Sequence, residues 1–279
     1  MKKISRRSFL AAAGLTVAAL ALTACGGSAS TASSAASSVA ASSEAASTSA
    51  AAELTTVEAG KLTMATNAAF PPYEMTTDAG AFEGIDIDTA QAIADKLGLE
   101  LQIDDMDFDA ALLSVQQGKA DIAMAGVTVT DERKNVMDFS DSYATGIQSI
   151  IVPEGSDIAS PDDLAGKMIG TQRGTTGYIY CSDDFGDDAV VAYDDGLTAV
   201  QALNNGQVDA VVIDNAPAKE FVAANPGLVL LETSYAEEDY AIGMAKGNTA
   251  LEDAVNAALE ELKADGTLQS IVDKYITAE

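Results

Sequence analysis

Apolar and polar residues follow two periodic patterns between residues 58 and 279. Strict alternation is typical of strands, whereas apolar residues spaced three or four apart are typical of helices. Residues 61–66 alternate and predict a strand, which Pro71 and Pro72 cannot continue. Residues 88–97 place apolar side chains on one helical face, and Gly98, a residue that favours helix ends, follows them.

The change from a strand pattern to a helix pattern recurs along the chain. Further strands are predicted at 99–103, 121–125, 148–152, 189–192, 210–213 and 240–244, with another just before residue 174. Further helices are predicted at 107–118, 197–204, 215–224, 251–262 and 268–275, and a short one opens at Ser160. Strands that alternate with helices predict α/β layers with a mainly parallel sheet.

One turn sequence occurs twice. The segment QGKAD at 117–121 returns 88 residues later as NGQVD at 205–209, each time between a helix and a strand. The repeat indicates two similar α/β lobes. Helix-to-strand turns that contain glycine are also common in α/β proteins, so this alternative stays open.

The first 57 residues have a different composition. Residues 1–24 combine a basic start with an apolar run at 9–22, shorter than the roughly 20 residues that span a bilayer, and predict a signal peptide. Arg6 and Arg7 resemble a twin-arginine export signal, and an ordinary basic start is the alternative. The segment LTAC at 22–25 resembles a lipobox, which would leave Cys25 as a lipidated N-terminus. The Ser/Ala-rich residues that follow, to residue 57, predict a flexible tether.

Charge and composition exclude several classes of function. The chain has 279 residues, enough for one large or two small domains, and a net charge of −28, or −32 without the four basic residues before Cys25. So acidic a body argues against binding nucleic acid or an anionic membrane surface. The chain has no histidine, which excludes Ser-His-Asp and Cys-His catalysis and removes the commonest nitrogen ligand of metals. We expect neither a metal nor a cofactor.

Candidate binding chemistry follows the strand at 121–125. Gly126, the Thr128 hydroxyl and Arg133 come directly after it, and a guanidinium can donate two parallel hydrogen bonds to one carboxylate. The alternative is that Thr130 and the acids after it cap a helix, with Arg133 serving only that helix.

Two more strand ends carry suitable groups. Thr175 and Thr176 follow a strand and could begin a helix, whose N–H groups favour a carboxylate. Asp214 follows four apolar residues and is either the N-cap of the next helix or the partner of an α-ammonium. Cys181 has no partner once Cys25 is lipidated, and its neighbours Tyr178, Ile179 and Tyr180 suggest burial.

Three ordered segments carry a family resemblance that covers about residues 58–279. The stretch GVTVTDERKNVMDFSDSY at 126–143, the loop FPPYE at 70–74 and the block GIDID at 84–88 resemble the bacterial family 3 extracellular solute-binding proteins, the amino-acid receptors of ABC importers. The resemblance implies a periplasmic-binding-protein-like fold of two α/β lobes with mixed sheets. Residues 58–143 and 240–279 would form the first lobe and 144–239 the second, with hinge strands near 143–146 and 238–240.

The resemblance also implies roles for single residues. Arg133 falls at the family's carboxylate-binding arginine and Asp214 at its ammonium-binding acid. Phe70 and Phe108 fall at the positions that sandwich the ligand side chain, although both could instead be core residues. The positions that supply hydroxyls and N–H groups are Gly126, Thr128, Thr175 and Thr176. Asn67 and Gln172 fall at variable contact positions, where some members carry an acid and a lysine; the amides here leave the specificity open.

The resemblance implies a monomeric lipoprotein on the outer face of the cell membrane, which binds a free, polar amino acid and delivers it to ABC permease subunits. An enzyme on the same fold, similar to cyclohexadienyl dehydratases, is the alternative, with Glu74 and Asp214 as candidate acids or bases. A signalling or adhesion lipoprotein would differ only in its partner.

Overall fold

The structure is a computed structural model that describes residues 54–276. The predicted signal peptide, Cys25 and the predicted tether as far as residue 53 lie outside the described residues. Leu54 packs against an apolar cluster, and the Val57 N–H donates to Asp121 Oδ1 at 2.7 Å, so the end of the predicted tether already contacts the folded body. Within 54–276, no helix combines the length and apolar character needed to cross a membrane.

The first lobe is built on a mixed five-stranded sheet with the order β5-β1-β6-β14-β7. Strand β1 pairs in parallel with β5 and β6, whereas β14 pairs antiparallel with β6 and β7. The strands are β1 (Lys61–Thr66), β5 (Glu100–Asp105), β6 (Ile122–Ala123), β7 (Met137–Phe139) and β14 (Gly243–Ala245). A small antiparallel sheet of β2 (Ala69–Phe70), β3 (Glu74–Thr76) and β4 (Phe82–Glu83) belongs to the same part of the chain.

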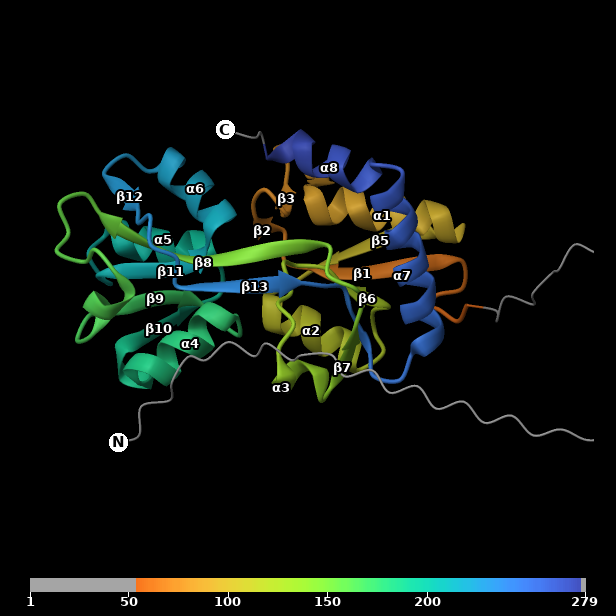
Figure 1. Cartoon of the computed structure of the whole chain (residues 1–279), viewed down its shortest axis with the longest axis horizontal. Coiled ribbons are helices and arrows are strands. Elements are labelled where there is room, and N and C mark those ends of the chain that lie inside the picture. The colour runs from red at the N-terminus through yellow and green to blue at the C-terminus, as the bar shows by residue number, and fades with distance from the viewer. Residues whose placement is uncertain (1–53, 277–279) are drawn as a thin grey trace, which may run out of the picture. The chain divides into compact units, whose positions relative to one another are not determined.

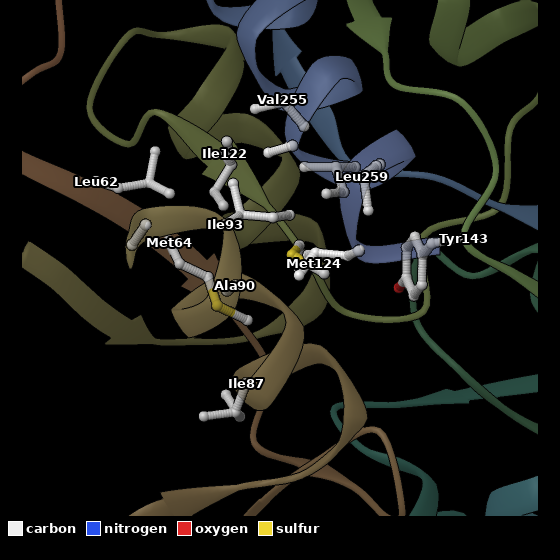
Figure 2. Packing of buried hydrophobic residues seen from close by; sticks show 14 of the residues in the cluster. Leu62, Met64, Ile87, Ala90, Ile93, Ile122, Met124, Tyr143, Val255 and Leu259 are labelled. Atoms are coloured by element: carbon white, nitrogen blue, oxygen red, sulfur yellow. The ribbon is translucent and has the colours of Figure 1, made fainter. Parts of the chain in front are cut away.

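Helices cover both faces of this sheet (Figure 1). The helices are α1 (Ile85–Leu97), α2 (Phe108–Gln116), the short α3 (Asp131–Lys134), α7 (Thr249–Ala264) and α8 (Thr267–Tyr275). One core lies between the sheet and α1, α7 and α8, and a second lies against α2. Figure 2 shows Met64 of β1, Ile93 of α1 and Leu259 of α7 in the same cluster of buried residues, and Met64 is fully buried.

The second lobe contains a mixed six-stranded sheet with the order β10-β9-β11-β8-β12, and β13 also pairs with β8. The strands are β8 (Ala144–Pro153), β9 (Ile169–Gln172), β10 (Val190–Tyr193), β11 (Ala210–Asp214), β12 (Leu228–Leu230) and β13 (Ala236–Tyr240). Helices α5 (Gly196–Asn204) and α6 (Asn215–Ala224) enclose one core, and α4 (Thr176–Phe185) encloses the other. Two 3-10 helices, Pro161–Leu164 and Asp187–Ala189, complete the lobe.

Strands β8 and β13 run side by side between the two groups of elements (Figure 1). They pair antiparallel from Gln148 with Ala236 to Ala144 with Tyr240. Gly146 makes this crossing possible, because a Cβ there would lie 2.5 Å from the Tyr240 ring and 2.8 Å from Asp214 Oδ2. The predicted α/β fold of two mixed-sheet lobes is confirmed.

The strand predicted at 240–244 is wrong in detail. Tyr240 ends β13, and β14 begins only at Gly243. The chain changes partners between them: the Ala241 N–H donates to Val127 O, and the Ile242 N–H donates to the Ser140 hydroxyl. Helix α1 begins three residues before the predicted start, because the N–H groups of Ile85 and Asp86 donate to Pro72 O and Tyr73 O. Strands β2, β3, β4, β7 and β12 were not predicted.

Candidate functional site

One cavity between the two lobes brings together all ten residues that the sequence singled out for binding. Its empty volume is about 440 Å³, which includes the part that is open to solvent. The predicted residues in its lining are Asn67, Phe70, Phe108, Gly126, Thr128, Arg133, Gln172, Thr175, Thr176 and Asp214. The lining also contains Glu74, Ala125, Gln148, Val212, Ile213 and Tyr240.

Helix α3 presents Arg133 to the cavity. Thr130 caps this helix by accepting the Arg133 N–H at 3.1 Å, so the capping interpretation holds for the backbone. The guanidinium has a separate role: Nη1 donates to Thr128 O at 2.7 Å and Nη2 to Gly174 O at 3.1 Å, and it stacks 5.4 Å above the Phe108 ring. Burial lowers the pKa of Arg133, but a guanidinium stays charged and has five N–H donors. Donors therefore remain for an anion.

The N-terminus of α4 faces the same cavity from the second lobe. Thr175 is its N-cap and accepts the Tyr178 N–H at 3.3 Å, while its own hydroxyl donates to Gln172 O at 2.8 Å. The first N–H groups of a helix have no intrahelical partner, so those of Thr176 and Gly177 are available to an anion. Arg133 and this helix end together can hold one carboxylate from two lobes.

Asp214 occupies the N-cap position of α6 but makes no side-chain capping hydrogen bond. Its Oδ2 instead accepts the Tyr240 hydroxyl, and the Gln148 amide lies 3.5 Å away. Burial raises the pKa of Asp214 to about 7, against the opposing effect of the Tyr240 hydrogen bond. A buried carboxyl in this state is suited to bind a cation, since a nearby positive charge favours its ionised form.

A second acid, Glu74, lies fully buried in the lining. Neither of its carboxyl oxygens has a donor, and Asp86 Oδ1 also lacks one. Burial, followed by the charge of the adjacent Asp86 and their shared hydrogen bond, raises the pKa of Glu74 well above its ordinary value. A proton on Glu74, donated to Asp86, satisfies both carboxyls. Oδ2 of Asp86 accepts the N–H of Gly126 at 3.0 Å and the Tyr143 hydroxyl at 2.8 Å, so the Gly126 N–H is not directed at the cavity.

Asn67 and Gln172 meet across the cavity. Gln172 Nε2 donates to Asn67 Oδ1 at 2.8 Å, and Asn67 Nδ2 donates to Met106 O at 3.0 Å. Phe70 is partly buried and stacks on Tyr73 with a centroid separation of 5.9 Å, whereas Phe108 is 6% exposed and belongs to a core cluster. Phe108 therefore serves the core and the cavity together.

Sequence reasoning missed two polar groups of the lining, Gln148 and Tyr240, and one directly behind it, Glu238. Glu238 accepts the Thr128 hydroxyl at 2.9 Å and the Gln148 amide at 3.0 Å. In β13 burial alternates: Glu238 and Tyr240 are buried, and Glu237 and Asp239 are exposed. The sequence does not show this alternation, because three charged residues stand in succession there.

The profile of the bacterial extracellular solute-binding proteins, family 3, matches residues 62–278. The chain belongs to this family. It is 32% identical to the L-cystine-binding protein TcyJ of Escherichia coli strain K12 over 226 residues, 80% of this chain and 85% of TcyJ. Among solved structures, an ancestral arginine-binding protein bound to glutamine is similar with a TM-score of 0.75 and 41% identity, covering 78% of this chain and 99% of that one.

A second solved structure extends the likeness to another binding protein. The arginine-, lysine-, histidine-binding protein ArtJ from the thermophilic bacterium Geobacillus stearothermophilus is 34% identical, with a TM-score of 0.75, over 78% of this chain and 96% of ArtJ. The family resemblance inferred from three short segments is therefore confirmed over nearly the whole described chain. The binding roles of the single residues stay predictions.

Proposed function

We propose that this protein is the substrate-binding lipoprotein of an amino-acid ABC importer, which captures a free amino acid between its lobes and delivers it to a membrane permease. The observation that carries the proposal is the pairing of opposite charges in one cavity. Arg133, on the first lobe, suits an α-carboxylate, and Asp214, on the second lobe, suits an α-ammonium. A zwitterion held by both is fully contacted only when the lobes close, with the β8–β13 pair as hinges.

A receptor role accounts for both charges without a reacting group, so the protein is proposed not to be an enzyme. Support comes from the relatives and similar structures named above, which are binding proteins. Incubation with amino acids should return each one chemically unchanged.

The ligand class follows from Glu74, an acid of the lining that does not bind the main-chain charges of the ligand. Arg133 and Asp214 account for the two main-chain charges of an amino acid, and Glu74, whose proton is shared with Asp86, is a further acid of the lining. A cationic side chain would favour the loss of that proton, because a nearby positive charge stabilises the ionised form of a buried carboxyl. The preferred ligand is therefore an amino acid with a basic side chain. ArtJ, whose name includes arginine, lysine and histidine, supports this choice.

The Glu74→Gln variant tests the ligand class. A calorimetric screen of the twenty amino acids and cystine should give the tightest binding to wild-type protein for a basic amino acid. Glu74→Gln keeps the size but loses the charge, so it should weaken L-arginine binding by about tenfold or more, as about 1.4 kcal/mol implies, and change L-glutamine binding little. Glu83→Gln, at the exposed position of β4, is the control. Equal L-arginine affinity in wild-type and Glu74→Gln proteins would exclude Glu74 as the side-chain partner.

Membrane anchoring is proposed through Cys25, which lies outside the described residues. Replacing Cys25 with serine should remove the acylated thiol, so the protein should appear in the medium or remain as an uncleaved precursor. The measurement is fractionation combined with the mass of the product, because an uncleaved apolar segment can also hold a precursor at the membrane. Mature-length Cys25→Ser protein in the membrane fraction would contradict lipid anchoring.

A further inference from the structure

We propose that Glu238, on the returning hinge strand β13, is a positioning residue that turns the Thr128 hydroxyl into a hydrogen-bond acceptor for the ligand's α-ammonium. The inference rests on the proposed amino-acid receptor function. It changes the part that the sequence predicted for Thr128, which was placed with Gly126 and Arg133 at the carboxylate.

Glu238 is buried without a countercharge in direct contact. Its side chain is 6% exposed, and none of the described ion pairs includes it. Oε2 accepts two neutral donors, and both the Glu238 charge and a hydrogen bond with Glu238 add to the burial that raises the pKa of Tyr180. Keeping a carboxylate here costs free energy that neutral hydrogen bonds and the charge of Arg133, which is not in direct contact, offset only in part. Such a residue suits a site that gains a cation on binding.

The contact with Thr128 fixes the direction of its hydroxyl. A hydroxyl has one proton and two lone pairs, while an ionised carboxylate only accepts. Thr128 Oγ1 lies 2.9 Å from Glu238 Oε2 and donates its proton to it. The Thr128 hydroxyl can therefore only accept hydrogen bonds from other groups. The Thr176 hydroxyl, 3.5 Å away, can use one lone pair, and the other is left for the cavity that Thr128 lines. A carboxylate finds no donor there, whereas an ammonium N–H finds an acceptor.

Gln148 connects this acceptor to Asp214. Its Nε2 donates to Glu238 Oε2 at 3.0 Å and lies 3.5 Å from Asp214 Oδ2, so one amide lies between two carboxyls. Both acids and the Thr128 acceptor thus lie close together at the cavity, where the Thr128 carbonyl also accepts from Arg133 and the Thr128 hydroxyl lies 3.5 Å from Thr176 of α4. Glu238 acts through Thr128 and Gln148 and does not itself line the cavity.

The test compares one amino acid with the same molecule lacking its ammonium. Calorimetry is done with L-arginine and its deamino analogue, 5-guanidinopentanoate, on wild-type, Glu238→Gln and Glu237→Gln proteins. Glu237 is exposed on the same strand and serves as the matched control. Glu238→Gln should weaken L-arginine binding by about tenfold, the scale of one charge-assisted hydrogen bond, and the analogue by less than about twofold. Equal losses for both compounds, or no loss, would overturn the proposal.

A second variant keeps the test decisive if Glu238→Gln does not fold. Thr128→Val removes the acceptor itself, so it should show the same selective loss of L-arginine, and adding it to Glu238→Gln should cost little more. An equal loss of both compounds in Thr128→Val overturns the ammonium role. L-Glutamine and its deamino analogue form a second pair. Wild-type protein that binds none of the twenty amino acids or cystine would overturn the receptor function, an outcome distinct from a loss of selectivity.

Discussion

Replacing Arg133 with lysine is expected to weaken amino-acid binding by about 30-fold or more. Lysine keeps the charge but loses the planar fork, so it cannot hold Thr128 O and Gly174 O while also presenting two donors to a carboxylate. Disturbing a buried charged contact of this kind costs roughly 2–5 kcal/mol. Calorimetry with the tightest-binding basic amino acid measures the loss.

The matched control is Arg173→Lys, because Arg173 lies in the same loop as Gly174, is about half exposed and pairs with exposed Asp194 at 3.4 Å. That change should leave affinity within about twofold, as expected for a surface ion pair. Small-angle scattering adds a second measurement. Wild-type protein should compact on saturation with ligand, and Arg133→Lys should need a correspondingly higher ligand concentration. Unchanged affinity in Arg133→Lys, or tight binding without compaction, would reject this arrangement.

Six of the ten candidate residues could be predicted because their chemistry follows strand ends. In open α/β sheets the carboxyl ends of strands converge on one edge, so Gly126, Thr176 and Asp214 had to approach one another once both lobes formed. The family segments added the two phenylalanines and the amide pair, which no spacing rule would have chosen. All ten line one cavity, although their roles await the measurements described above.

Glu238 and Tyr240 could not be found in this way. Their inward direction depends on the pairing of β13 with β8, strands about ninety residues apart in the chain, and local patterns do not contain that register. The same long-range pairing ends one strand at Tyr240 and starts the next at Gly243, where the sequence suggested a single strand. Gln148 was missed because a polar residue within an apolar strand gives no sign of the carboxyls that flank it.

Asp214 shows a different limit of prediction from the sequence. The sequence correctly placed it at the start of a helix, and capping was the simplest use of an aspartate there. The side chain turns instead to Tyr240 and Gln148, because β13 delivers a hydroxyl and β8 an amide to the same point. A helix start can thus be predicted locally, while the use of its side chain depends on residues far along the chain.

This difference predicts how Asp214→Asn behaves without ligand. Burial holds the pKa of Asp214 at about 7 in the folded protein, above the ordinary 3.8. A raised carboxyl pKa means that ionisation opposes folding, so the wild-type protein loses stability as pH rises from about 4 to 7. Asparagine removes that cost. The variant should therefore unfold at the same temperature as wild type near pH 4 and at a higher temperature than wild type at pH 8. At pH 8 its free energy of unfolding should exceed that of wild type by up to about 4 kcal/mol.

Binding should change in the opposite direction. An α-ammonium needs the ionised carboxylate, so wild-type affinity should fall by about tenfold per pH unit below pH 7, as one proton taken up by the free protein requires. Asp214→Asn should bind weakly and lose this dependence, and any slope that remains would belong to other acids such as Glu74. Calorimetry between pH 5 and 8, beside melting curves of both unliganded proteins, makes the comparison. A lower melting temperature for the variant would show that Asp214 stabilises the helix start, and an equal pH slope in both proteins would show that Asp214 does not hold the ammonium.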